Sequence, residues 1–190
     1  MLSKKNVRDT IRKQRQSMTS GQVASFSRSI IDYVLEFKPF LLARTVAFYL
    51  PIDNEVDTSY LLNSHKIKTK KLCLPVVRPK QKLVFAHFKP GDPLQKGAYG
   101  IKEPSSSDWL EIGSIDLFLL PLVGFDPEGT RLGYGGGYYD RALSTVKTDR
   151  KKPVIVGLAF QFQGVAQLPN ATHDVPLHHV VTENGVQSFI

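Results

Sequence analysis

The residues best suited to chemistry lie in one glycine-rich stretch, Gly124–Arg141, which reads GFDPEGTRLGYGGGYYDR. A backbone with several glycines can adopt positive φ angles and approach a ligand closely, because glycine has no Cβ. The N–H groups from Gly133 to Gly137 could therefore surround phosphate oxygens. Arg131 adds a planar fork of donors that suits the same oxygens. Asp140 could hold a magnesium ion beside them.

The flanking segments predict how this loop is supported. Residues 116–123 form an apolar run that is too short and too uniform for an amphipathic helix, which favours an interior strand. Residues 138–143 contain no helix breaker, so we expect a helix to begin near Gly137. A strand, a glycine loop and a helix N-terminus in this order suit an anion. A plain turn is the alternative, and neither the GxxxxGK[ST] nor the GxGxxG pattern is present.

The segment RLGYGGGYYDR, which follows LPLVGFDPEG, resembles the signature of the 5-formyltetrahydrofolate cyclo-ligase family, also called methenyltetrahydrofolate synthetases. The resemblance covers nearly the whole chain. It implies a three-layer α/β fold similar to sugar-phosphate isomerases and coenzyme A transferases. Independently, predicted strands that alternate with helices indicate a mostly parallel or mixed central sheet covered on both faces.

The resemblance implies an ATP-dependent ligase that cyclises 5-formyltetrahydrofolate to 5,10-methenyltetrahydrofolate, with ATP as co-substrate and Mg²⁺ as cofactor. Arg131 and Lys4 are then the expected catalytic residues. The expected ATP-binding residues are Lys4, Arg8, Arg131, Gly133, Tyr134, Gly135, Gly136, Gly137, Tyr138 and Asp140.

The N-terminal segment 3–17 predicts a basic amphipathic helix with Ser3 as its N-cap. Lys4 and Arg8 are one turn apart and could bind one phosphate group together. They also match a lysine and an arginine, four residues apart, with which the resembling family reaches the nucleotide phosphates. We expect Arg12 and Arg15 to be surface residues.

A second candidate site follows the predicted strand 45–50, because open α/β sheets place their sites at the carboxyl ends of strands. Three carboxylates occur there within five residues, Asp53, Glu55 and Asp57. Asp57 or Thr58 could cap a helix predicted at 59–67. Glu55 has no such use, and the resemblance implies that it binds the reduced pterin.

Residues 89–111 form a long glycine- and proline-bearing segment, and such loops are usually functional or mobile. It contains YGIKEP, which resembles the family's GI-x-EP segment near the substrate. Trp109 is either a core or lid aromatic or a surface on which the pterin stacks. We carry Trp109 and Tyr138 forward with Glu55 as candidate substrate contacts.

The segment 173–183, HDVPLHHVVTE, resembles the family's DVPxDxxxTE ending. Asp174 is retained and is expected to bind the metal together with Asp140. His178 replaces the second acid, so that acid's role does not transfer. The cluster of His173, His178 and His179 could suggest zinc, but cysteine partners and HxxxH spacing are absent from the sequence.

The remaining pattern predicts a helix that begins at Thr19 or Ser20 and ends at Pro39. Segments 72–77 and 83–88 predict a hairpin, and 153–160 and 180–183 predict two more strands. We expect one domain over residues 1–190, with the N-terminal helices 3–37 packed on the α/β core.

Composition limits the classes further. The 190 residues are 42% hydrophobic and 22% charged, which is ordinary for a globular protein. We find no segment apolar enough to span a membrane and no apolar signal core. The single cysteine, Cys73, lies in an apolar run and is expected to be a buried thiol. These features predict a cytoplasmic monomer.

The formal net charge of +8 indicates an anionic partner. ATP and a folate, with or without a polyglutamate tail, meet that requirement, and we expect neither a nucleic-acid nor a membrane partner. Two alternatives stay open. The N-terminal cations could bind nucleic acid, although no RNA-binding motif accompanies them. A sugar-phosphate isomerase would bind phosphate in the same loop without ATP.

Overall fold

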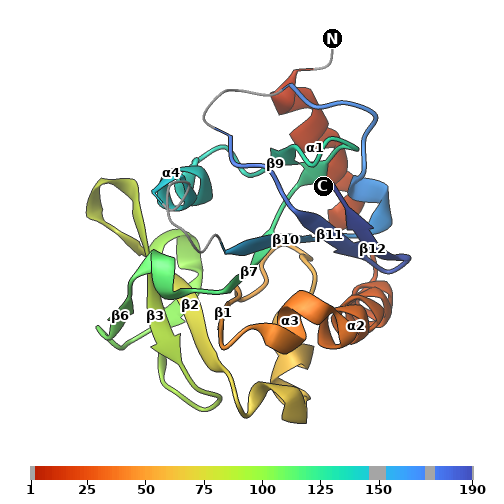
Figure 1. Ribbon diagram of the computed structural model, residues 1–190. Helices are drawn as coiled ribbons and strands as arrows, with labels where there is room; N and C mark the ends of the chain where they lie inside the picture. Colours follow the sequence, from red (N-terminus) through yellow and green to blue (C-terminus); the bar gives the residue numbers. More distant parts are fainter. Residues whose placement is uncertain (1–2, 146–152, 170–173, 190) are drawn as a thin grey trace.

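The computed structural model describes residues 3–145, 153–169 and 174–189 and is built around an eight-stranded sheet (Figure 1). In spatial order the strands are β12 (Gly185–Ser188), β11 (His179–Thr182), β10 (Val154–Leu158), β7 (Leu117–Pro121), β1 (Thr45–Ala47), β2 (Lys71–Arg78), β3 (Lys82–Phe88) and β6 (Trp109–Leu110). The strands from β11 to β2 pair in parallel. Antiparallel strands complete both edges, so the predicted mixed sheet is confirmed.

The central strand β7 shows why its sequence is apolar without interruption. Leu117 and Leu119 point into one hydrophobic core, and Phe118 and Leu120 point into a second core on the other face. Since side chains alternate along a strand, a strand covered on both faces must be apolar at every position.

Helices cover both faces of the sheet. The helices α2 (Ser20–Glu36) and α3 (Lys38–Leu42) contribute Ile30, Val34 and Phe40 to the first core. The short helix α4 (Tyr138–Ser144) contributes Ala142 and Leu143 to the second core on the opposite face. Figure 1 shows these helices on the two sides of the sheet, which gives the predicted three layers.

The N-terminal helix α1 (Lys4–Gln16) packs at one end of the sheet rather than on its face. Ser3 caps it as predicted, because its side chain accepts a hydrogen bond from the Asn6 N–H. Val7 and Ile11 contact a third core beside the small antiparallel sheet of β8 (Gly124–Phe125) and β9 (Arg131–Leu132). This packing places the polar face of α1 next to the glycine-rich stretch.

Two helix predictions were wrong in detail. The segment 59–67 forms two 3₁₀ turns, Thr58–Asn63 and His65–Ile67, because Ser64 between them is extended and caps the second. Asp57 caps the first, as one of the two alternatives proposed. Pro39 does not end α2, which stops at Glu36. It is the second residue of α3, where its missing N–H has no cost.

The segment 89–111 also has more structure than expected. It contains a hairpin of β4 (Leu94–Lys96) and β5 (Lys102–Pro104), with a 3₁₀ turn, Ala98–Gly100, at its tip. Three further 3₁₀ turns lie at Pro79–Gln81, Ile112–Ser114 and Gln161–Gln163. The buried carboxylate of Glu103 ties the hairpin to the main sheet, because it accepts a 3.0 Å hydrogen bond from the Val77 N–H.

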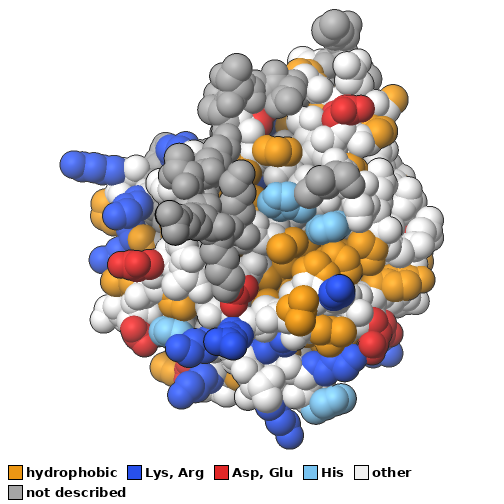
Figure 2. Space-filling model, viewed as in Figure 1, with side chains coloured by type: hydrophobic (Ala, Val, Ile, Leu, Met, Phe, Trp, Pro, Cys, Tyr) orange, Lys and Arg blue, Asp and Glu red, His pale blue; other side chains and the backbone are white. Residues whose placement is uncertain are grey.

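Side chains of different kinds gather on different parts of the surface. In the view of Figure 2, lysine and arginine side chains lie mainly along the left and lower edges, and hydrophobic side chains are exposed to their right. The exposed hydrophobic residues include Leu41 and Leu42 of α3 and Val186 of β12. None of the helices within the described ranges combines the length and the apolar character that a bilayer crossing requires.

Candidate functional site

A cavity of about 840 Å³ lies where α1, the segment after β1, the glycine-rich stretch and the β4–β5 hairpin meet. It therefore opens beyond the carboxyl ends of the parallel strands β1 and β7, as the sequence predicted. Of the predicted site residues, the following line it: Lys4, Arg8, Glu55, Arg131, Gly133, Tyr134, Gly135, Gly136, Gly137, Tyr138, Asp140 and Asp174.

The glycine loop has the conformation that its composition predicts. Gly135 has a φ of 104° and Gly137, the N-cap of α4, a φ of 61°, and both angles are unfavourable for residues with a side chain. Arg8 lies against the loop, where its Nε donates a 2.7 Å hydrogen bond to the Gly133 carbonyl. Helix α4 has only seven residues, so the cations around the loop matter more than the helix dipole.

Two ion pairs lie beside the loop. Lys4 Nζ is 2.9 Å from Asp174 Oδ2, and Arg131 Nη2 is 2.6 Å from Asp140 Oδ1. Asp140 Oδ1 also accepts a hydrogen bond from the Val175 N–H, which brings the two predicted metal-binding acids to neighbouring positions. The Nε of Arg131 is buried and has no hydrogen-bond partner within the described part of the chain. Lys4, Arg8 and Arg131 thus give this part of the cavity positive charge, and the Arg131 Nε–H could still donate a hydrogen bond to a ligand.

Magnesium fits this region only in part. Across residues 3–145, 153–169 and 174–189, no group of three or more potential metal-binding side chains occurs. Mg²⁺ in phosphate sites is commonly held by one or two carboxylates plus phosphate oxygens. Asp140 and Asp174 meet that smaller requirement, provided that their ion pairs with Arg131 and Lys4 rearrange.

Glu55 also lines the cavity and is held by a tight turn. The Glu55 N–H donates to the Ile52 carbonyl at 2.9 Å, and the central residues Asp53 and Asn54 have φ angles of 51° and 55°. This is the pattern of a type I′ turn, which favours aspartate and asparagine. The Glu55 carboxylate accepts hydrogen bonds from the Ile52 N–H at 3.0 Å and the Tyr134 hydroxyl at 2.9 Å.

Burial dominates the electrostatics of Glu55, whose residue surface is only 5% exposed. Loss of hydration raises the pKa of Glu55 above its usual value. The Ile52 N–H, the Arg15 charge and the Tyr134 hydroxyl partly oppose that rise. The carboxylate is therefore costly to ionise in the folded protein, which is common for groups with a functional role.

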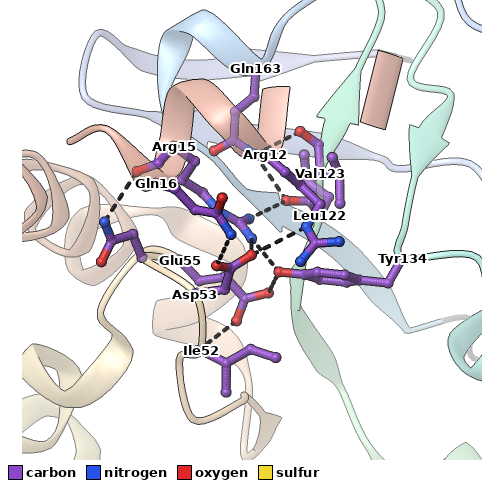
Figure 3. Close-up of polar contacts among 11 residues, drawn as sticks. Arg12, Arg15, Gln16, Ile52, Asp53, Glu55, Leu122, Val123, Tyr134 and Gln163 are labelled. Carbon is purple, nitrogen blue, oxygen red and sulfur yellow. Dashed lines mark hydrogen bonds and ion pairs between the residues drawn. The ribbon is translucent and has the colours of Figure 1, made fainter. Parts of the chain in front are cut away.

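Arg15 is the main site residue that the sequence analysis missed, because it was expected at the surface. Its side chain is 1% exposed and lies at the centre of the polar cluster in Figure 3. It donates to Asp53 at 3.2 Å and to the Tyr134 hydroxyl. A signal was present in the sequence, because Val7, Ile11 and Arg15 are spaced four residues apart and all three are buried.

Arg12 also differs from its expected role. It lines the cavity, and its Nε is 3.3 Å from Asp53 Oδ2. The guanidinium carbons of Arg12 and Arg15 lie 5.5 and 5.6 Å from the Tyr134 ring centre. Burial, with the charge of Glu55, raises the Tyr134 pKa, so its hydroxyl keeps its proton. The Tyr134 side chain thus points to Glu55, and only its backbone belongs to the glycine loop.

The hairpin tip reaches the cavity from the other side. The hydroxyls of Tyr99 and Tyr138 are 2.6 Å apart, and their rings meet edge to face. Tyr138 is the first residue of α4 and lines the cavity, so this pair connects the hairpin to the glycine loop. The segment resembling GI-x-EP therefore lies beside the predicted substrate region.

Trp109 does not lie with the other predicted residues. It is on the edge strand β6, is 39% exposed and is not among the residues that line the cavity. The Arg78 guanidinium lies 5.1 Å from its ring centre. Stacking of the pterin on Trp109 therefore stays a prediction, and its position on the edge strand, outside the cavity lining, does not favour it.

The remaining candidates have structural roles where they are described. His178 Nδ1 accepts a hydrogen bond from the Ile155 N–H, and His179 contacts Ser188 on the paired strand. The third histidine of the suggested zinc cluster, His173, lies outside the described residues. Cys73 is buried as predicted, and its burial raises the thiol pKa to about 12.

Comparison with known proteins gives a consistent result. The profile of the 5-formyltetrahydrofolate cyclo-ligase family matches residues 1–183. The 5-formyltetrahydrofolate cyclo-ligase of Haemophilus influenzae is 35% identical over 182 residues, covering 94% of this chain and 96% of that protein. The Escherichia coli enzyme of the same name is 34% identical over 180 residues, covering 93% and 98%.

Solved structures agree. The 5,10-methenyltetrahydrofolate synthetase of Aquifex aeolicus superposes with a TM-score of 0.84 at 33% identity, covering 98% of this chain and 92% of that one. The synthetase of Mycoplasma pneumoniae gives a TM-score of 0.77 at 26% identity, with coverages of 96% and 99%. Both the sequence and the arrangement of its elements therefore place the chain among these enzymes: it belongs to the 5-formyltetrahydrofolate cyclo-ligase family.

Proposed function

We propose that this chain cyclises 5-formyltetrahydrofolate to 5,10-methenyltetrahydrofolate with ATP, releasing ADP and phosphate. One observation carries the proposal. A single cavity is lined by Lys4, Arg8 and Arg131, by the glycine loop and by the buried carboxylate of Glu55. Its volume of about 840 Å³ is in the upper part of the range for small-molecule sites, which suits two substrates side by side.

The reaction needs ATP because a formamide is a poor electrophile and its oxygen a poor leaving group. In the proposed first step, the formyl oxygen attacks the γ-phosphorus and ADP leaves, which gives an iminium phosphate. N10 then adds to the activated carbon and loses its proton. Expulsion of phosphate forms the methenyl bridge. Such chemistry requires positioning and charge neutralisation rather than a protein nucleophile.

The cationic part of the cavity would bind the triphosphate. Lys4 and Arg8 approach from α1 and Arg131 from β9, and the amides from Gly133 to Gly137 complete the surroundings. The acids that now pair with Lys4 and Arg131 keep these side chains at the cavity before the nucleotide arrives. Arginine beside a transferred phosphoryl group stabilises the charge that develops in the transition state.

Asp140 and Asp174 would hold Mg²⁺ together with the phosphate oxygens. Bound magnesium would supply further neutralisation of the triphosphate charge. The arrival of phosphate gives Lys4 and Arg131 new anionic partners, so both acids could turn to the metal without leaving a buried cation unpaired.

Glu55 would bind the polar edge of the reduced pterin and place N10 next to the formyl carbon. Its carboxylate is fixed by the Ile52 N–H and the Tyr134 hydroxyl, which is the pre-organisation that such positioning needs. Tyr138 lines the cavity between the glycine loop and the hairpin tip and is proposed as a second contact to the folate.

The test follows the absorbance of the methenyl product. Purified protein is mixed with 5-formyltetrahydrofolate, Mg²⁺ and ATP, and a matched reaction omits ATP. We expect product only when ATP is present, with ADP and phosphate formed in equal amounts. Absence of product from a folded protein over a range of pH would reject the proposal. Phosphate binding that is indifferent to ATP would then favour the isomerase alternative.

A further inference from the structure

We propose that Arg15 is a positioning residue that fixes the Glu55 carboxylate through the Tyr134 hydroxyl. The inference rests on the proposed function, because it concerns how the pterin end of that site is held. Arg15 itself does not line the cavity, whereas Tyr134 and Glu55 do. Arg15 would therefore act on the substrate only through another side chain.

The geometry forms a continuous relay (Figure 3). Asp53 Oδ2 is 3.2 Å from Arg15 Nη2, the same nitrogen donates to the Tyr134 hydroxyl, and that hydroxyl donates to Glu55 Oε1 at 2.9 Å. A tyrosine hydroxyl has one proton. Since the guanidinium can only donate to it, the Tyr134 proton is directed to Glu55.

The other end of the relay is anchored to the backbone. Arg15 Nη1 approaches the Leu122 carbonyl at 3.5 Å, at the point where β7 leads into the glycine-rich stretch. Gln16 donates to Asp53 Oδ1 at 2.7 Å, and the Asn54 side chain donates to the Arg15 carbonyl at 3.1 Å. These hydrogen bonds therefore join the end of α1 directly to the turn that holds Glu55.

The position of Arg15 argues against a role in packing alone. It occupies the third place of the buried stripe on α1 after Val7 and Ile11, where an apolar side chain would avoid the desolvation of a charge. Its buried Nε lacks a hydrogen-bond partner among the described residues, which adds a further desolvation cost to the burial of the charge. An arginine kept there at this cost fits a residue that orients the site.

The proposal separates the two substrates. The contacts of Lys4, Arg8 and Arg131 with the glycine loop and its acids do not include Arg15, Tyr134 Oη or Glu55. Disturbing the relay should therefore impair use of the folate and leave use of ATP nearly intact. A general loss of structure would impair both.

The experiment is a double-mutant cycle with Arg15→Lys, Tyr134→Phe and the two combined, measured by steady-state kinetics for each substrate. Loss of a hydrogen bond to a buried charged group predicts a fall of about tenfold or more in folate kcat/KM for each single variant. The ATP KM should stay within about twofold. If Arg15 acts through Tyr134, the double variant should be no worse than the poorer single one.

Lys13→Ala is the matched control, because it removes one positive charge from an exposed position of the same helix. It should leave both kinetic constants unchanged. Circular dichroism and thermal unfolding check the fold of each variant. If Arg15→Lys does not fold, Asp53→Asn replaces it in the cycle, since it weakens the hold on Arg15 without removing the guanidinium.

Two results would overturn the inference while wild-type protein forms the methenyl product. Multiplicative effects in the double variant would mean that Arg15 and Tyr134 act independently. An equal rise of the ATP KM would mean that the relay is only structural. A folded wild type that forms no product at all would instead overturn the proposed function, and this inference with it.

Discussion

At the scale of single residues, Glu55 shows how function and stability oppose each other in this site. Its carboxylate is 5% exposed, and burial raises its pKa despite hydrogen bonds from Ile52 and Tyr134 and the charge of Arg15. An acid with a raised pKa binds its proton more tightly in the folded state than in the unfolded state. Stability contributed by this group is therefore greatest at low pH and declines as pH rises above the ordinary glutamate pKa.

Glu55→Gln tests this relation, because it removes the charge and keeps nearly the same shape. We expect folate kcat/KM to fall by about tenfold or more, since a charge-assisted hydrogen bond is replaced by a neutral one. Because glutamine does not titrate, the variant lacks the loss of stability that Glu55 causes as pH rises. The difference in thermal midpoint, variant minus wild type, should therefore increase from acid to neutral pH. Kinetics and thermal unfolding over that range measure both effects, and unchanged folate affinity would remove Glu55 from the pterin site.

The same pKa predicts a pH dependence for the wild-type enzyme. If the ionised carboxylate binds the pterin, folate kcat/KM should decline on the acid side at a pH above the ordinary glutamate pKa. Besides burial, the groups that act on the pKa of this carboxylate are the Ile52 N–H, Arg15, Tyr134 and Asp53. If the Glu55→Gln variant shows the same decline of folate kcat/KM at low pH, that decline must come from the titration of another group.

Lys4 and Lys5 form a natural pair for testing the nucleotide end. Lys4 lines the cavity and pairs with Asp174, whereas Lys5 is exposed on the next position of α1. Lys4→Ala should raise the ATP KM by about tenfold, because one charge-assisted contact to phosphate is lost. Lys5→Ala removes the same charge and should leave the ATP KM unchanged. Equal effects would mean that only the overall charge of α1 matters.

Sequence reasoning identified cations near glycines but not a buried cation within a hydrophobic stripe. Lys4, Arg8 and Arg131 were found because their type and spacing suit phosphate, and all three line the cavity. Arg15 was assigned to the surface because charged residues are rarely buried. Only the fold brings Asp53 and Tyr134 to α1, because these partners of Arg15 are 38 and 119 residues away from it along the chain.

At the scale of elements, the glycine loop makes a prediction that depends on backbone angles alone. Gly135 has a φ of 104°, where an alanine is strained by roughly 1–3 kcal/mol. Gly135→Ala should therefore lower the thermal midpoint and weaken ATP binding, because the loop must change shape to accept a Cβ. Calorimetry of ATP binding and thermal unfolding measure the two consequences.

Gly21→Ala in α2 is the control for this change. A Cβ at that position would meet its nearest neighbour, the Thr19 hydroxyl, at an ordinary distance of 3.9 Å. Glycine within a helix costs about 0.5–1 kcal/mol relative to alanine, so this substitution should stabilise the protein. Stabilisation by Gly135→Ala as well would show that the loop does not need its positive φ.

Elements were predictable where one face or both faces of a segment are buried. The run 116–123 indicated an interior strand, and Leu117 to Leu120 indeed alternate between two cores. The 3₁₀ turns at 58–67 have the apolar spacing of a helix, but Ser64, which is extended and caps the second turn, divides them. The strands β4 and β12 are mostly exposed and therefore lack that apolar signal. Their pairing with the neighbouring strands β5 and β11 cannot be read from their own sequence.

At the scale of the whole molecule, the order of the strands in the sheet cannot be predicted from the local pattern of apolar and polar residues. The parallel strands β1 and β7 are adjacent although about 70 residues separate them along the chain, and their shared carboxyl edge creates the cavity. The family resemblance implied a three-layer α/β fold, and periodicity predicted a mostly parallel or mixed sheet, but neither predicted the order of its strands. The position of Trp109 has the same origin, because β6 pairs with β3 at the edge of the sheet.

The net charge of +8 and the single cavity proposed for both substrates lead to a prediction about ligand-linked stability. A ligand that binds only the folded state at 100 times its Kd adds about 2.7 kcal/mol. For a chain of this size that corresponds to a rise of about 5–10 °C in the thermal midpoint. Mg²⁺–ATP and 5-formyltetrahydrofolate should each raise the thermal midpoint by this amount. When both sites are filled with analogues that cannot react, the midpoint should rise further than with either analogue alone.

Salt distinguishes the contributions of the proposed phosphate and pterin ends of the cavity. The ATP-dependent shift should shrink as ionic strength rises, because Lys4 and Arg8 are partly exposed and the Debye length falls from about 10 Å at 0.1 M to 3 Å at 1 M. The folate-dependent shift should change less, since the Glu55 carboxylate is buried. If both shifts shrank in parallel, the two ligands would share one electrostatic site, and the division of the cavity into a phosphate end and a pterin end would be wrong.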